Sequence, residues 1–583
     1  MASTPQHPVL VLGAGINGAA VARELILNAI PVWLVDTNDI AFGATSRSTR
    51  LIHGGLRYLE HGDFPLVRES LSERSRLRSL APQFVKPMRI HIPLRQRSGG
   101  LVGSAARFLG GEWSPLRHVL PSAFNAAPER GLWIVRMGLS LYDRFARDPL
   151  FPKHTVQAVG SRSAPRVNDV DYRWLCTYTD AQMRYPERFV VALLEQTRQL
   201  AEQTGTEFCL LTYHHADFQH NRVELRRGNA STTVAEIEPA ALINATGAWG
   251  DRTLEKLRVD SKPIFGGTKG SHFICYQSGL REAIGDDGVY AEATDGRLVF
   301  VLPFGEGVLV GTTDVRFEDP PERAVASTEE LDYLIGMVNE LFPGVDLTTD
   351  DVEMHYSGVR PLPCSLGGNT AAISRGHSIE RHQSGSVPVY TLVGGKLTTC
   401  RLFAEQVAEQ VCDQIGVEWS PRSRELPVSG GENYPPDEQA VAAEWQRLAR
   451  AFGLTPAQIG AMWALCGNRV EKILSKCHSV ESENLYNTQI PLAFVRSVLR
   501  HEWVTTLDDL VERRLMLVYQ PGLSIETLQQ LAACLVDEGL LESSQQEAAV
   551  QATCERLHQH FGKRLSAEPT PLDEQTDPGS PRP

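Results

Sequence analysis

The sequence predicts a mixed α/β protein that ends in an all-helical region, and three stretches carry that prediction. The first is an apolar, strand-like run at 9–12 that enters a glycine turn and then a helical pattern over 19–28. The second is a pair of strand-like runs at 298–302 and 307–311, separated by a turn that predicts a hairpin. The third is a series of segments after residue 425 with apolar residues at helical spacing.

The composition indicates a large globular protein and argues against several classes. The chain has 583 residues, of which 42% are hydrophobic and 22% charged, so it must bury a sizeable core. A net charge of −13 would repel nucleic-acid backbones, and we expect no nucleic-acid partner. The ten cysteines show no Cys-x-x-Cys pair and the chain has no His-Glu-x-x-His helix, so no metal site is predicted. Without a signal peptide or a long apolar run, we expect a cytoplasmic protein, or one attached to a membrane surface.

The N-terminal stretch predicts a dinucleotide-binding turn. Glycines 13, 15 and 18 follow the first strand, and Asp36 ends a second apolar run, 23 residues beyond Gly13. Glycines allow a tight turn and close backbone approach, the following helix presents its N-terminus to a pyrophosphate, and the carboxylate accepts from ribose hydroxyls. This turn alone does not distinguish FAD from NAD.

The stretch 44–60 combines small hydroxyl residues, paired glycines and cations, as a loop around an anionic cofactor would. A serine-rich surface loop is the alternative interpretation. Here the sequence resembles the FAD-dependent glycerol-3-phosphate dehydrogenases, a branch of the D-amino-acid-oxidase-like flavoproteins. The matching stretches occur in family order at 13–19, 51–60, 244–249, 269–272, 311–314, 356–362 and 394–399.

The resemblance implies a Rossmann-like FAD-binding domain interleaved with an antiparallel-sheet substrate domain. Within 8–418, the FAD-binding parts are expected at about 8–85, 155–265 and 355–418, and the substrate-domain parts at about 86–154 and 266–354. A helical C-terminal domain is expected over 425–562, with helices at 441–452, 456–466, 491–501, 506–517 and 525–538, and a disordered tail over 566–583.

The resemblance also implies the residues of the site. Those expected to bind FAD are Gly13, Gly15, Asn17, Gly18, Asp36, Thr45, Ser46, His53, Gly54, Gly55, Gly247, Gly394, Gly395, Lys396, Leu397 and Thr398. Those expected to bind the substrate phosphate are Arg57, Arg360, Arg375 and Lys269. A guanidinium suits this task because its planar fork binds phosphate oxygens bidentately.

The chemistry itself requires a base for the hydroxyl proton. His272 is the candidate, because imidazole titrates near neutral pH, although a structural histidine is the competing interpretation. Arg57, Arg360 and Tyr58 are expected beside it, Tyr58 to position the substrate or to pack under the flavin. Lys396 is expected to stabilise negative charge on the reduced flavin.

By resemblance, the expected activity is oxidation of sn-glycerol 3-phosphate to dihydroxyacetone phosphate, with electrons passed to quinone or another acceptor. A flavin enzyme for another small hydroxy acid or amine, and a flavin-binding scaffold without turnover, stay open. The segment 98–130 departs from the family and holds arginines and aromatic residues suited to anionic lipids, or else is an elaborated loop. A homodimer is also possible.

Overall fold

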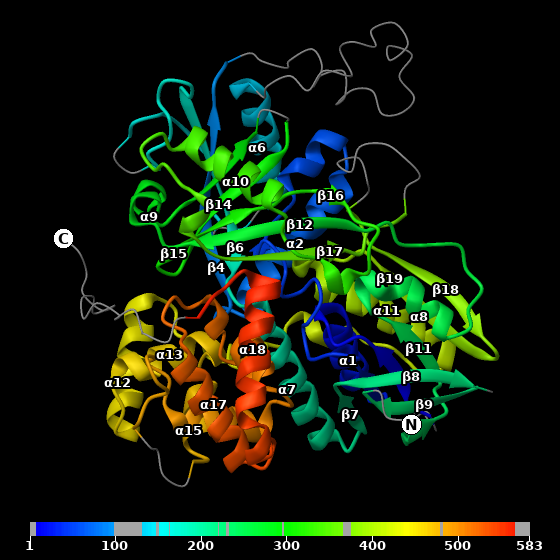
Figure 1. Cartoon of the computed structure of the whole chain (residues 1–583). Helices are drawn as coiled ribbons and strands as arrows, with labels where there is room; N and C mark the ends of the chain where they lie inside the picture. Colours follow the sequence, from blue (N-terminus) through cyan, green and yellow to red (C-terminus); the bar gives the residue numbers. More distant parts are fainter. Residues whose placement is uncertain are drawn as a thin grey trace, which may run out of the picture.

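The computed structural model describes residues 7–97, 131–146, 148, 151–161, 164–219, 221–228, 232–293, 296–364, 375–477 and 482–565. The predicted insertion at 98–130 and the predicted tail at 566–583 lie outside these residues. Figure 1 shows a parallel sheet beside α1, a second sheet around β12 and β14, and a helical bundle that contains α13, α15, α17 and α18. The mixed α/β class with a helical C-terminal region is confirmed.

The first sheet, in the described part of the chain, has five parallel strands and one antiparallel edge strand. In spatial order these are β18 (Ser378–Ser384), β19 (Val387–Val393), β11 (Ala241–Asn244), β1 (Val9–Leu12), β2 (Val32–Val35) and β7 (Phe208–Leu211). One face packs on α1 (Ile16–Leu27), α7 (Pro186–Thr204) and α11 (Cys400–Ile415). The other face packs on β8 (His214–Gln219), β9 (Arg222–Arg227), β10 (Thr233–Ile237) and α8 (Gly250–Lys256). Burial on both faces explains why the central strands read as continuous apolar runs.

The second sheet is largely antiparallel. Among the described residues its strands, in spatial order, are β16 (Val315–Arg316), β12 (Thr268–Cys275), β15 (Gly307–Gly311), β14 (Leu298–Phe304), β13 (Gly288–Glu292), β4 (Val85–Leu94), β6 (Trp174–Met183) and β3 (Leu51–Ile52), with β17 (Val352–Arg360) paired to β12 and β5 (Thr155–Ala158) paired to β6. The predicted hairpin is confirmed as β14 and β15. Helices α9 (Ser278–Ile284) and α10 (Thr328–Leu341) cover one face, and α2 (Phe64–Leu80) and α6 (Leu132–Ala146) pack on the other.

The sheets divide the chain differently from the predicted segments. We assigned 155–265 and 355–418 to the FAD-binding part, but β5, β6 and β17 pair in the second sheet. The chain therefore crosses to the first sheet after Met183 and after Arg360. The boundaries were misplaced because the pairing partner of a strand depends on distant residues, which a local pattern does not contain.

The C-terminal region consists of short helices. They are α12 (Glu438–Phe452), α13 (Pro456–Cys466), α14 (Arg469–Leu474), α15 (Leu492–His501), α16 (Leu507–Asp509), α17 (Ile525–Asp537) and α18 (Gln546–Phe561). The prediction of one helix over 506–517 was wrong, because α16 widens into a π-helical turn at Leu510–Arg514 and Met516 adopts a positive φ of 56°. At this turn Arg513 and Arg514 both bind the buried Asp39 of the first sheet's loops.

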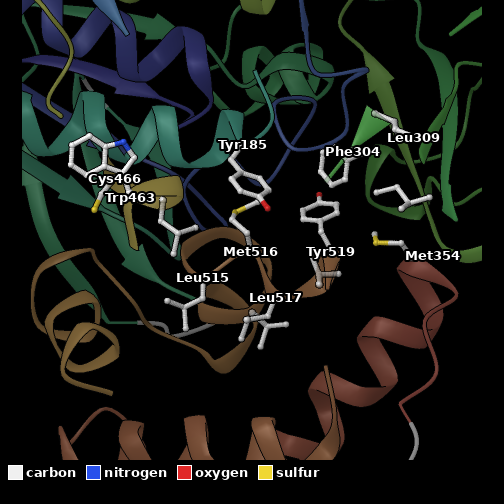
Figure 2. Packing of buried hydrophobic residues seen from close by; sticks show 14 of the residues in the cluster. Tyr185, Phe304, Leu309, Met354, Trp463, Cys466, Leu515, Met516, Leu517 and Tyr519 are labelled. Atoms are coloured by element: carbon white, nitrogen blue, oxygen red, sulfur yellow. The ribbon is translucent and has the colours of Figure 1, made fainter. Parts of the chain in front are cut away.

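The helical region shares its hydrophobic core with the second sheet. One cluster of buried residues runs from Ile90 and Tyr356 in the sheet to Phe494 and Leu531 in the helices. Figure 2 shows Tyr519 between these parts, with ring centroids 5.5 Å from Phe304 and 6.4 Å from Tyr185. The helices therefore pack against the sheet through one continuous hydrophobic core. No helix in the described ranges is both long and apolar enough to cross a bilayer.

Candidate active site

A cavity of about 710 Å³ lies between the two sheets, a size typical of ligand sites. Its walls include Gly13, Asp36 and Ala245, which follow the carboxyl ends of β1, β2 and β11. Strands of the second sheet close the opposite wall with Gly270 and Arg360. Ligands of open α/β sheets bind at this edge of the strands, so the cavity has the position that a dinucleotide site requires.

The glycine turn is shaped for close backbone packing. Gly13 has φ +103°, and an added Cβ there would lie 2.6 Å from the Ala245 carbonyl oxygen. A Cβ on Gly18 would lie 1.8 Å from the Gly13 carbonyl oxygen, although Gly18 does not line the cavity. Gly15 is the N-cap of α1 and, being a glycine, provides no side-chain cap of its own. The positive end of α1 is therefore directed to a cavity wall of bare backbone, as an anion site needs.

Asp36 and Thr45 line the same end and hold the turn in place. Asp36 accepts hydrogen bonds from the Ala14 amide at 2.7 Å and the Asn38 amide at 2.8 Å, and burial raises its pKa to about 6. The Thr45 hydroxyl accepts from the Ile16 amide at 3.1 Å. Ser46 donates to the Phe42 and Gly43 carbonyls and is not among the lining residues, so its role is to shape the loop.

The residues fit a large cofactor with hydrogen-bond donors. The side-chain oxygen of Asn17 lines the cavity, is buried and has no partner, which is costly unless a ligand donates to it. Gly394 and Gly395 have φ of 74° and 89°, and a Cβ on Gly395 would lie 2.5 Å from Asn17 Nδ2. Gly247, with φ 63°, and Leu397 also line this cavity.

The segment 53–58 meets the loop after β19. The His53 amide donates to Thr398 Oγ1 at 3.1 Å, and that hydroxyl in turn donates to the His53 carbonyl at 3.3 Å. Gly54 and Gly55 do not line the cavity. A Cβ on Gly54 would lie 2.3 Å from Leu71 Cδ2, and one on Gly55 would lie 2.2 Å from the Tyr58 ring. The glycines therefore let this segment pack, while His53 and Tyr58 face the cavity.

Lys396 lies above Tyr58, with its ammonium 4.1 Å from the ring centroid and 3.3 Å from Ser70 Oγ. Burial lowers the pKa of Lys396 to about 8, against the opposing charges of Glu69 and Asp63. Burial and, to a smaller extent, Lys396 lower the pKa of His53 to about 4. At neutral pH this end therefore presents a charged lysine beside a neutral imidazole.

Three arginines gather around Tyr58. Burial raises the pKa of Tyr58, and the positive charges of Arg375, Arg57 and Arg360 oppose that rise. Arg360 and Arg375 line the cavity, whereas Arg57 is half-buried behind it. Burial lowers the pKa of Arg360 to about 10, because the neighbouring Asp314 compensates for that burial only in part. The structure thus places Arg360 and Arg375 on the cavity wall and Arg57 near Tyr58, outside the lining.

His272 lines the cavity from β12. Its Nε2 lies 2.9 Å from Thr49 Oγ1, its ring stacks on Tyr356 at 4.9 Å, and its Nδ1 is buried without a partner. Burial, followed by the charges of Arg360 and Arg50, lowers the pKa of His272 well below its usual value. His272 is therefore neutral at neutral pH. His53, which we predicted only as a cofactor ligand, is a second neutral imidazole on the cavity wall.

The prediction that Lys269 binds substrate is not supported by its position. Its ammonium binds Glu330 at 2.8 Å and the Val325 carbonyl at 2.7 Å, and it does not line the cavity. Successive side chains of a strand point to opposite faces, so Gly270 and His272 reach the cavity while Lys269 points away.

Several residues that hold the cavity wall had no predicted role in the site, and Arg50 was expected only to reshape the pocket. Arg50, with φ +61°, is buried and binds Glu187 at 2.8 Å, and it also bonds the hydroxyl of Tyr519 at 2.5 Å. Its neighbour Thr49 is the residue that contacts His272. Asp314, which pairs with Arg360 and Arg375, lies in the matching stretch 311–314, but no role was predicted for it. Their signal was the dense cluster of hydroxyls and cations at 44–60 and the polar end of 311–314.

Comparisons with known proteins agree with this geometry. A family model described as FAD dependent oxidoreductase matches residues 8–410. A glycerol-3-phosphate dehydrogenase of Synechocystis is 30% identical over 84% of this chain and 86% of its own length. A D-erythritol 1-phosphate dehydrogenase of Brucella abortus is 28% identical over 88% of this chain and 95% of its own. The solved glycerol-3-phosphate dehydrogenase of Bacillus halodurans, complexed with FAD, shares the fold at a TM-score of 0.68 and 20% identity, with 96% of each chain covered. The chain belongs to the FAD dependent oxidoreductase family, and its cofactor is FAD.

Proposed function

We propose that this enzyme oxidises sn-glycerol 3-phosphate to dihydroxyacetone phosphate. The observation that carries the proposal is the group of Arg57, Arg360 and Arg375 around Tyr58. A buried excess of positive charge is unfavourable unless an anion compensates for it, and guanidinium groups favour phosphate oxygens. The names of similar proteins, a glycerol-3-phosphate dehydrogenase among them, support the same substrate class.

In this proposal Arg360 and Arg375, which line the cavity, bind the phosphate and fix the carbinol carbon near the loop that carries Lys396, while Arg57 adds positive charge from beside Tyr58. FAD, when bound, supplies the acceptor for the hydride. The glycine turn, Asn17 and the 394–397 loop would hold it. The hydroxyl proton goes to a neutral imidazole, for which His272 and His53 are both candidates. Lys396, charged at neutral pH, stabilises negative charge that develops at this end.

A second phosphorylated polyol is a specific alternative, because D-erythritol 1-phosphate dehydrogenase is among the similar proteins. Its substrate carries the same kind of anionic group, so the arginines do not discriminate between the two. The length of the carbon chain would decide, through contacts in the rest of the cavity.

The test is anaerobic reduction of the bound flavin, followed by its visible absorbance. We expect sn-glycerol 3-phosphate to bleach the flavin fastest, D-erythritol 1-phosphate more slowly, and glycerol, lactate or glycine far less. Faster bleaching by D-erythritol 1-phosphate would identify that compound as the better substrate. Faster bleaching by an amine or an unphosphorylated hydroxy acid would refute phosphate recognition. If no compound reduces the flavin, the result favours the alternative of a flavin-binding scaffold without turnover. Replacement of His272 and of His53 by Gln, one at a time, then identifies the proton acceptor by the larger loss of reduction rate.

We also propose, on the sequence resemblance alone, that quinone is the electron acceptor and that the enzyme reacts with it at a membrane surface. The reduced enzyme should then be reoxidised faster by a soluble quinone than by oxygen, and sediment with anionic vesicles. Sedimentation equilibrium tests the possible homodimer.

A further inference from the structure

Asp314 joins the two arginines that line the cavity. Its Oδ1 accepts from Arg360 Nη1 at 3.0 Å, and its Oδ2 accepts from Arg375 Nη2 at 3.0 Å. The carboxyl follows β15, while the arginines come from the end of β17 and from a loop beyond it. One carboxylate thus divides its two oxygens between guanidinium groups from separate segments.

Further acceptors fix the plane of Arg360. Its Nη2 donates to Thr312 Oγ1 at 3.0 Å and to the Thr313 carbonyl at 3.1 Å. A Cβ on Gly270 would lie 2.1 Å from the same nitrogen, so the guanidinium packs directly on the Gly270 backbone in β12. The arginine is held on one side by 312–314 and faces the cavity with the other.

Asp314 itself does not line the cavity. Two guanidinium groups held this close repel each other, as the lowering of the Arg360 pKa by Arg375 reflects. A carboxylate behind them removes part of that repulsion and restricts both side chains to one geometry. Without it we expect the two arginines to separate.

We propose that Asp314 is a positioning residue that makes this end of the cavity specific for a phosphate monoester. It binds Arg360 with one oxygen and Arg375 with the other, so that both are directed to the same end of the cavity, while it stays out of the cavity itself. The inference rests on the proposed function, because it assumes that the arginines bind the substrate's phosphate. It predicts that loss of the carboxylate weakens phosphate recognition, although it makes the site more positive.

The two accounts of Asp314 give opposite results for Asp314→Asn. If the carboxylate merely opposed an incoming anion, its removal would lower KM for sn-glycerol 3-phosphate and the Ki for inorganic phosphate. If it positions the arginines, KM and Ki should both rise on the order of tenfold, with kcat within about twofold of the wild type. Asp314→Glu, which keeps the charge, should restore part of the affinity. Glycerol oxidation should not change.

Asp287→Asn is the matched control. Asp287 also pairs with an arginine, Arg89 at 2.8 Å, in the second sheet and outside the cavity, so its loss should leave KM unchanged. If Asp314→Asn does not fold, Thr312→Val removes one acceptor of Arg360 without a change of charge and should raise KM about threefold to tenfold.

An unchanged or lower KM in Asp314→Asn, or a KM that rises equally in Asp287→Asn, overturns the inference. So does loss of FAD and of kcat in the same proportion, which would show a structural role only. If sn-glycerol 3-phosphate does not reduce the flavin of the wild-type enzyme, the proposed function is refuted instead. That result is obtained before any variant is made.

Discussion

The two ends of the cavity are built in different ways. At the dinucleotide end, the turn from Gly13 to Gly18 and Asp36 come from a short stretch of chain, and backbone groups make most of the contacts. At the arginine end, the groups come from segments far apart in the sequence, and charged side chains hold one another. Shape dominates the first end and charge the second.

The difference shows which changes each end tolerates. Backbone packed against backbone cannot easily move aside, so an added Cβ in the glycine turn would displace the turn itself and weaken the binding of a ligand there. A charged side chain that has several hydrogen-bond acceptors keeps the others when one is removed. Its interaction with a ligand is then weakened but not blocked. A single substitution should therefore cost more at the first end than at the second.

The largest expected effect comes from Gly13→Val. The new side chain would meet the Ala245 carbonyl and require a β-branched residue at φ +103°. Overpacking and backbone strain together cost about 2 to 5 kcal/mol, so FAD binding should fall by at least about 30-fold. Flavin absorbance of the purified protein and titration of the apoprotein with FAD measure the loss.

Gly205→Val is the matched control, because Gly205 also has a positive φ, +68°, but no atom lies within 4 Å of an added Cβ. It should lower the melting temperature and keep the flavin. If both variants lose FAD equally, strain of the fold rather than shape of the turn explains the loss.

This contrast also explains how much the sequence could predict. The turn at 13–18 and the acid at 36 form a local pattern, and Gly13, Gly15, Asn17 and Asp36 all line the cavity. Arg57, Arg360 and Arg375 were found only through a resemblance to a family, since arginines are common on surfaces. Their partner Asp314 and the contact of Thr49 with His272 depend on strand pairing across the second sheet. The pairing of Lys269 with Glu330, away from the cavity, could not be predicted, because the resemblance gives a position in the chain and not the face of the strand.

At the arginine end the expected effect is smaller. Arg360→Ala should reduce kcat/KM for sn-glycerol 3-phosphate by about ten- to a hundredfold, the value of one charge-assisted contact of about 1.5 to 3 kcal/mol. FAD should stay bound, because the glycine turn lies at the other end. The measurement is anaerobic reduction at a series of substrate concentrations, with Arg89→Ala, an arginine outside the cavity, as the control. Loss of FAD in Arg360→Ala would show that the two ends are not independent.

The smallest effect is expected where the two ends meet, at Lys396. Because burial lowers its pKa to about 8, Lys396 carries its charge at pH 7 and loses it as the pH rises through that value. Flavin reduction should therefore slow by about five- to tenfold above pH 8, the value of an interaction of about 1 to 1.4 kcal/mol.

Two substitutions assign that slowing to Lys396. Lys396→Arg should keep the rate high above pH 8, since a guanidinium stays charged, and Lys396→Met should be slow at every pH and show no alkaline decline. If the reduction rate of Lys396→Met still declines above pH 8, another group titrates there. Lys396 is then not the cause of the alkaline decline. Lys396→Met could also weaken FAD binding while Lys396→Arg does not. The charge of Lys396 would then contribute at both ends of the cavity, and the dinucleotide end would depend on charge as well as on shape.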